Sequence, residues 1–156
     1  MATTHLPVDA RHPGDPSAPA SRVRRDAAYQ AYVVLRSAFV VAPVVFGLDK
    51  FPNLLVRWDQ YLAPVLARPL PVTPRHAMYA VGVVEVLAGV VVALHPRLGA
   101  VVVAGWLGGI IVNLLLIPGF YDVALRDFGL LLAAVALQRL ATRYDARPTW
   151  WPLAKA

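Results

Sequence analysis

Long apolar runs separated by short polar segments dominate the chain. Each of four runs is close to the roughly 20 residues that an α-helix needs to cross the hydrocarbon of a bilayer. The runs extend over residues 31–48, 77–94, 98–117 and 123–140. This pattern predicts an all-α fold, an integral membrane four-helix bundle.

The segments that flank the runs divide the chain into three parts. Residues 1–30 carry four prolines among small and polar residues and have no periodic apolar face, so a flexible cytoplasmic tail is predicted. Residues 31–140 form the predicted transmembrane domain. Residues 141–156 form a second tail, in which Trp150 and Trp151 are expected to anchor at the membrane interface.

The segment between the first two runs has a pattern of its own. Its apolar positions recur at helical spacing with polar residues between them, which predicts a short amphipathic helix in the interfacial region. A role as a lid over the bundle is an equally good interpretation, and the two roles are compatible. The periodic apolar positions are Leu54, Leu55, Trp58, Tyr61, Leu62, Val65 and Leu66.

Composition and charge agree with a membrane protein of defined orientation. Hydrophobic residues make up 58% of the chain and charged residues 15%, which excludes a disordered chain and disfavours a soluble domain. With four spans both termini share one side, and nine basic residues there against four on the other side predict cytoplasmic termini. The net charge of +6 is thereby explained by topology, and no nucleic-acid partner is expected.

Several kinds of chemistry are excluded by residue type. The chain has no cysteine, so a disulfide, a thiolate zinc site and an iron–sulfur cluster are all excluded. The histidines show no ligand spacing, and His76 and His95 flank one apolar run about 28 Å apart at 1.5 Å per residue. Neither a metal site nor an intrinsic cofactor is expected.

Polar side chains inside or next to the runs are the candidate site, because a charge at bilayer depth is costly and normally faces a partner or a cavity. Two cations and two anions within the runs sum to zero, which favours one neutral network. Glu85, near the bilayer middle, is expected to pair with Arg36 or Arg126. Lys50 is expected to reach the interface, and Asp49 to meet water or Arg126. The candidate pocket comprises Arg36, Asp49, Lys50, Glu85, Asn113, Arg126 and Asp127.

Glycines on the same helix faces are expected to let neighbouring helices approach closely. The polar network beside them has two interpretations. It locks the helices in register, or it handles a proton or orients a polar head group. The expected packing glycines are Gly47, Gly82, Gly89, Gly105 and Gly109.

Three segments carry a resemblance to a known family. FVVAPVVFGLDKFPN ends its helix in Gly-x-x-Lys-Phe, and VGVVEVLAGVVVALHPRLGA has a glutamate, Glu85, followed by a glycine and a short turn. NLLLIPGFYDVALRDFGLLLAAVAL opens its last helix with Ala-Leu-Arg-Asp. Together these segments resemble the DoxX-like (DoxX/DoxD) family of small bacterial membrane proteins over roughly residues 31–140.

The resemblance implies a four-helix bundle in the bacterial inner membrane. Some relatives are linked to quinone-reducing sulfur oxidation and others to oxidative-stress complexes. It therefore implies a redox-associated subunit with quinone as a ligand and a membrane or peripheral redox protein as a partner. In such a subunit Arg36 or Arg126 would donate hydrogen bonds to the head group and Glu85 would exchange a proton. An anchoring subunit of a larger complex and a small-solute or proton transporter remain open alternatives, as does catalysis.

Overall fold

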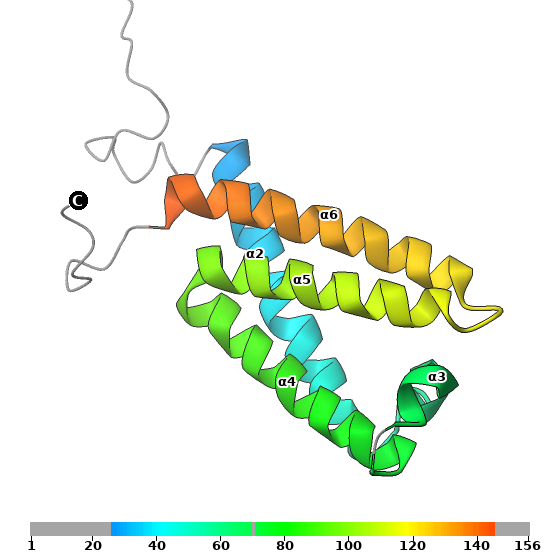
Figure 1. Ribbon diagram of the computed structural model, residues 1–156. Coiled ribbons are helices and arrows are strands. Elements are labelled where there is room, and N and C mark those ends of the chain that lie inside the picture. The colour runs from blue at the N-terminus through cyan, green and yellow to red at the C-terminus, as the bar shows by residue number, and fades with distance from the viewer. Residues whose placement is uncertain (1–25, 70, 146–156) are drawn as a thin grey trace, which may run out of the picture.

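Residues 26–69 and 71–145 are described by the computed structural model, and the secondary structure of this part of the chain consists of helices joined by loops, without a strand. Two one-turn helices, η1 (Trp58–Tyr61) and α3 (Pro64–Ala67), connect the first two long helices. The long helices are α2 (Ala27–Asp49), α4 (Pro74–Leu94), α5 (Pro96–Leu115) and α6 (Tyr121–Tyr144) (Figure 1).

The long helices pack mainly as two antiparallel pairs, α2 with α4 and α5 with α6 (Figure 1). The start of α2, the end of α6 and the turn between α4 and α5 lie together, and we call this the terminus end. The opposite end, where α2 and α5 end and α4 and α6 begin, is called the loop end. A core of buried side chains, including Phe39, Val92, Ala100 and Leu137, ties all four helices together.

Both outer helices extend beyond the predicted transmembrane domain. α2 begins at Ala27 because Asp26 caps it, accepting a hydrogen bond from the Ala28 backbone N–H at 3.0 Å. α6 continues to Tyr144. The rest of the predicted tails, 1–25 and 146–156, and with it the predicted tryptophan anchor, lies outside the described residues.

The continuous amphipathic helix predicted between the first two spans is not present. η1 and α3 are separate one-turn helices, and Leu62 and Ala63 between them are extended, with ψ of 118° and 129°. The physical reason is Pro64, because a proline disfavours the helical conformation of the residue that precedes it. A helix that begins at Trp58 therefore stops before Ala63.

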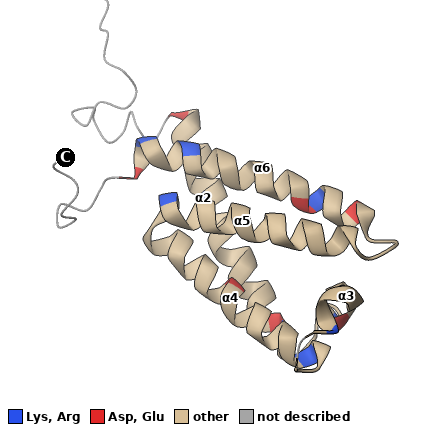
Figure 2. Ribbon diagram, viewed as in Figure 1, with Lys and Arg blue, Asp and Glu red and all other residues tan. Residues whose placement is uncertain are grey.

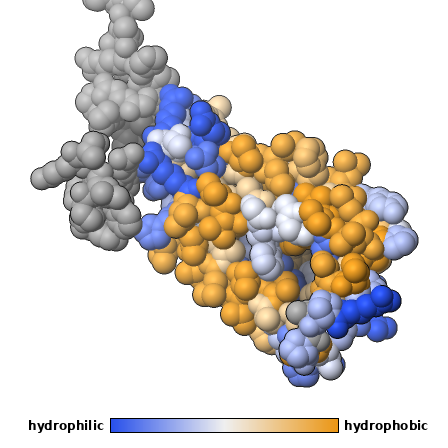
Figure 3. All heavy atoms as spheres, in the orientation of Figure 1, coloured by the Kyte–Doolittle hydropathy of each residue, from blue (hydrophilic) through white to orange (hydrophobic). Residues whose placement is uncertain are grey.

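Three of the four long helices, α2, α4 and α5, are long and apolar enough to cross a membrane. Apolar residues cover the middle of the molecule in Figure 3, and hydrophilic residues gather toward its two ends. Charged residues follow the same distribution in Figure 2, apart from a few on the helices. These features indicate a helical membrane protein. α6 is not among the three, since its apolar section is interrupted by Arg126, Asp127 and Arg139, and the fourth span remains a prediction.

Candidate functional site

A buried ion pair joins the end of α2 to the middle of α4. The Lys50 Nζ and Glu85 Oε2 atoms are 2.5 Å apart, and the two side chains are only 3% and 12% exposed. Lys50 is the residue at which α2 ends. The structure thus turns Lys50 inward toward Glu85, whereas the sequence predicted that it would reach the interface and that an arginine would partner Glu85.

Two glycines make this pair geometrically possible. α2 and α4 touch at Gly47 and Gly82, where a Cβ on either residue would lie 2.6 Å from the carbonyl oxygen of the other. The Lys50 side chain then crosses the position of a Gly82 Cβ, with its own Cβ and Cδ atoms 3.2 Å and 3.4 Å from that point. Because Gly82 lies one turn before Glu85 on α4, its missing side chain leaves the path by which Lys50 reaches the carboxylate.

The remaining predicted packing glycines divide into two groups. Gly89 also lies in the α2–α4 contact, since a Cβ there would be 2.8 Å from Val44 Cγ2 and 3.0 Å from the Val40 carbonyl oxygen. Gly105 and Gly109 on α5 are exposed, and no atom lies within 4 Å of a Cβ at either position. These two glycines form an open helix face in this chain.

Loop residues close the ion pair from the loop end. Lys50 Nζ lies 3.7 Å from the centroid of the Trp58 ring, a cation–π contact. The Trp58 indole N–H donates to Asp49 Oδ2 at 2.7 Å, and the backbone N–H groups of Leu54 and Leu55 also donate to Asp49. Asp49 is buried, and it holds the loop over Lys50 instead of meeting water.

A second indole approaches the pair from α5. Trp106 Nε1 is buried without a hydrogen-bond partner in the described part of the chain. It interacts electrostatically with the Glu85 carboxylate, at a geometry outside that of a hydrogen bond. Sequence reasoning gave Trp106 no role, because an aromatic residue in an apolar run carries no signal beyond packing.

Arg36 lies apart from this site. Its guanidinium donates to the Ala93 carbonyl oxygen at 2.5 Å and to the Tyr32 hydroxyl at 3.5 Å. Ala93 is eight residues beyond Glu85 on α4, about 12 Å along the helix. Arg36 therefore satisfies a carbonyl group in the last turn of α4, which has no partner within its own helix.

Asn113, Arg126 and Asp127 form no hydrogen bond or ion pair with Glu85. Asn113 Nδ2 donates to the Tyr61 carbonyl oxygen at 2.6 Å, and Asn113 Oδ1 accepts from the Ala63 N–H at 2.9 Å, so this side chain fixes the extended segment between η1 and α3. Arg126 is exposed and Asp127 is half-buried. Neither forms a hydrogen bond or an ion pair with another described residue.

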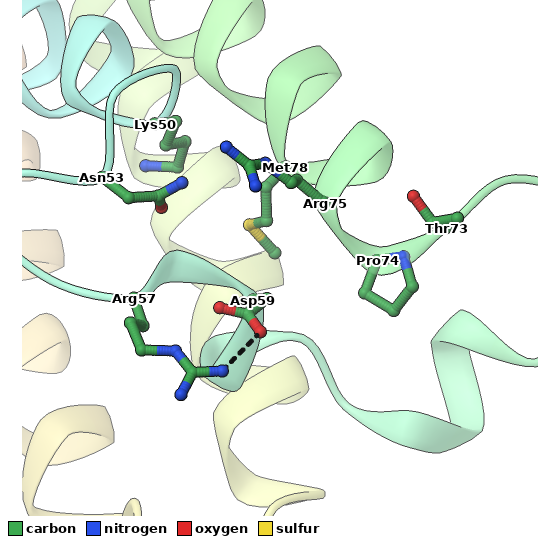
Figure 4. Close-up of a pocket in the computed structure, with 8 residues that line it drawn as sticks. All are labelled: Lys50, Asn53, Arg57, Asp59, Thr73, Pro74, Arg75 and Met78. Carbon is green, nitrogen blue, oxygen red and sulfur yellow. Dashed lines mark hydrogen bonds and ion pairs between the residues drawn. The ribbon is translucent and has the colours of Figure 1, made fainter.

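A cavity of about 390 Å³ opens beside the ion pair at the loop end (Figure 4). Its walls come from the end of α2, the following loop and the first turns of α4. Lys50 thus has a carboxylate on one side and a polar cavity on the other. The lining residues are Lys50, Asn53, Arg57, Asp59, Thr73, Pro74, Arg75 and Met78.

No group of three His, Cys, Asp or Glu residues in the described ranges is placed to hold a metal ion. Comparisons of the chain with protein-family models, with curated proteins and with solved structures find no match.

Proposed function

We propose that the chain is a DoxX-like protein with four spans, in which α6 is the fourth. α6 has 24 residues, about 36 Å of helix, against a hydrocarbon core of about 30 Å. It packs against α5, and its middle section, residues 128–138, carries no charge. Arg126 and Arg139 flank this section and have side chains long enough to reach the two interfaces.

The proposed location is the bacterial inner membrane, with both termini in the cytoplasm. The start of α2 and the end of α6 lie at the same end of the molecule, as an even number of spans requires (Figure 1). Nine basic residues on that side against four on the other support the orientation. The loop end then faces outward.

The proposed function is that of a redox-associated subunit that holds a quinone head group beside the Lys50–Glu85 pair. The observation that carries it is a buried ion pair with spare donors around it. Lys50 has three N–H donors and uses one on Glu85, while the Trp106 indole N–H, beside the Glu85 carboxylate, makes no hydrogen bond of normal geometry to a described residue. A quinone ring presents carbonyl oxygens that accept such hydrogen bonds, so the donors present fit this ligand.

The residues have distinct proposed roles. A bound quinone would supply redox chemistry in which two electrons are accompanied by two protons. Lys50 orients the head group by donating a hydrogen bond, and the Glu85 carboxylate accepts a proton from the reduced head group and returns it on reoxidation. Trp58 covers one side of the Lys50 ammonium, and Asp49 holds Trp58 in place. A membrane or peripheral redox protein would exchange the electrons.

Titration with a short-chain quinone tests this proposal through the fluorescence of Trp58 and Trp106. Glu85→Gln keeps the size of the side chain and removes its charge and its titratable proton. We expect quenching to require about tenfold more quinone in this variant. Asp122→Asn, which removes an exposed carboxylate at the start of α6, is the matched control and should titrate like the wild type. Identical curves for Glu85→Gln and the wild type, with both proteins folded, would contradict the proposal.

A second candidate function, an anchoring subunit of a larger complex, is favoured by the open face of α5. Gly105 and Gly109 are exposed four residues apart, and such small-residue faces allow close approach of a helix from another chain. Gly105→Leu should then reduce recovery of a stoichiometric partner from native membranes, while Leu98→Ala on the same helix should not. Equal recovery with all three proteins would remove this candidate.

A further inference from the structure

Three cations from three separate elements line the cavity at the loop end. Lys50 comes from the end of α2, Arg57 from the loop before η1, and Arg75 from the first turn of α4. Asp59 is the single acidic residue in the lining. In Figure 4 the Arg75 side chain extends toward Lys50 and Asn53, while Arg57 and Asp59 lie side by side.

The cations retain unused donors. Arg75 donates from Nε to the Tyr79 hydroxyl at 2.8 Å, and its two terminal nitrogens have no partner among the described residues. Arg57 contacts Asp59 at 3.4 Å, and its side chain is 83% exposed, so this surface pair holds the guanidinium weakly. Lys50 and Arg57 are thus paired with Glu85 and Asp59, while the Arg75 guanidinium has no anionic partner among the described residues.

The local backbone adds to this field. Arg75 lies in the first turn of α4, where the helix dipole is positive and the first N–H groups have no helical partner. Thr73 caps α4 by accepting a hydrogen bond from the His76 backbone N–H, and Pro74 has no N–H that needs a partner. Met78, which is buried, lies one turn further along α4 and contributes an apolar wall.

We propose that this cavity binds a phosphate group, presented by a phospholipid head group or as a free anion. Donors that converge from three elements suit an anion with three or four oxygens better than a planar carboxylate with two. A bound phosphate would give the Arg75 guanidinium an anionic partner and accept from the spare donors of Lys50 and Arg57. The loop end also lies where head groups would surround a spanning bundle.

The assay uses the full chain in nanodiscs of phosphatidylcholine. One arm titrates inorganic phosphate by calorimetry, and the other replaces part of the lipid with phosphatidylglycerol and counts retained lipids by native mass spectrometry. Arg75→Gln should weaken binding of the phosphate source about tenfold. Arg68→Gln removes an exposed cation of the same loop that does not line the cavity, and it should bind like the wild type.

Each outcome decides the proposal. Binding of either source, lost in Arg75→Gln and kept in Arg68→Gln, supports it and identifies whether lipid or free anion is the ligand. Absence of binding in both arms, or equal binding by the two variants, overturns it. Glu85 does not line the cavity, so quinone titration of Glu85→Gln keeps the two proposals separate. This variant should weaken quinone quenching and keep phosphate binding.

Discussion

The Lys50 ammonium is held between a carboxylate and an aromatic face, and its stem crosses Gly82. Removing two charges from water costs several kcal/mol per ion, and a short contact between them offsets that cost. Loss of one partner leaves the other charge buried and unpaired. Loss of both partners leaves only a change in packing. Substitutions of Lys50 and Glu85 are therefore expected to have strongly non-additive effects on the free energy of unfolding.

The first prediction concerns this coupling. Lys50→Met should lower the free energy of unfolding by about 3 kcal/mol, because it leaves Glu85 buried without its cation. Adding Glu85→Met should recover most of that loss, because two apolar side chains then occupy the site. Thermal unfolding of the single and double variants in detergent measures the effect. Additive losses from the two substitutions would show that the pair is not coupled.

At the terminus end, Asp26 links the first helix to the last. The Tyr144 hydroxyl donates to Asp26 Oδ2 at 2.5 Å, and the Ala28 N–H donates to Oδ1. These hydrogen bonds hold the pKa of Asp26 below its ordinary value of 3.8. Asp26 therefore contributes stability above the ordinary pKa, and this contribution is lost as the pH falls through the lowered value.

The second prediction follows from the cause of that shift. Tyr144→Phe removes the hydroxyl donor, so the pKa of Asp26 should rise toward 3.8, and the variant should lose less stability in acid because it has less of this contribution at neutral pH. Carbon NMR of labelled aspartate carboxyls in detergent measures the titration. Tyr29→Phe alters a neighbouring ring that packs edge-on against Tyr144, and it should leave Asp26 unchanged. Equal titration of Asp26 in the wild type and Tyr144→Phe would refute the assignment.

At the scale of helices, the glycines of the α2–α4 pair lie in a close helix contact, whereas two glycines of α5 lie on an open face. Gly47 and Gly82 bring two backbones into direct contact, whereas Gly105 and Gly109 face open space in this chain. A methyl group has no room at the first contact and ample room at the second. The same substitution should therefore have opposite effects on stability in the two helices.

The third prediction compares these sites. Gly82→Ala should lower the free energy of unfolding by about 1–3 kcal/mol, because the added carbon meets the Gly47 carbonyl and the Lys50 stem. Gly105→Ala should raise it by up to about 1 kcal/mol, because alanine favours the helix. Chemical unfolding in mixed micelles measures both changes. Two effects of the same sign would be inconsistent with the packing described.

The three most apolar helices could be predicted from sequence because continuous apolar length is a strong signal for a helix. The partner of Glu85 could not. Counting residues along each run gives the depth of a residue in the membrane but not the direction of its side chain. Lys50 turns inward only because Gly82 has no side chain in its path. The loop shows a second difference. Its periodic apolar positions predict one helix, whereas Pro64 prevents the helix from continuing through Ala63. The Asp26 cap falls within residues 1–30, for which the sequence predicts a tail because no periodic apolar face marks a helix there.

At the scale of the whole molecule, packing and polar chemistry occupy different ends. The completely buried Val92, Ala100 and Leu137 tie the helices together, and an aromatic cluster of Tyr29, Tyr32 and Tyr144 reinforces the terminus end. The ion pair, its indole neighbours and the cationic cavity lie toward the loop end. The well-packed end thus holds the bundle together, and the other end carries the sites proposed for ligands.

The fourth prediction concerns orientation. The chain has no cysteine, so one introduced thiol reports one position. Leu54→Cys, at a side chain that is 81% exposed in the loop, should react with an impermeant thiol reagent in intact cells. Arg143→Cys, near the end of α6, should react only after the membrane is permeabilised. The reverse pattern would invert the proposed topology.

The central claim, that the Lys50–Glu85 pair holds a quinone, is tested most directly by the quinone that the protein retains when purified from native membranes. The comparison is between the wild type and the double variant Lys50→Met with Glu85→Met, in which the fold is expected to persist. Lipid extracts of the wild type should contain close to one quinone per chain. The double variant should retain about a tenth of that amount or less. Equal quinone per chain in both proteins would contradict the account.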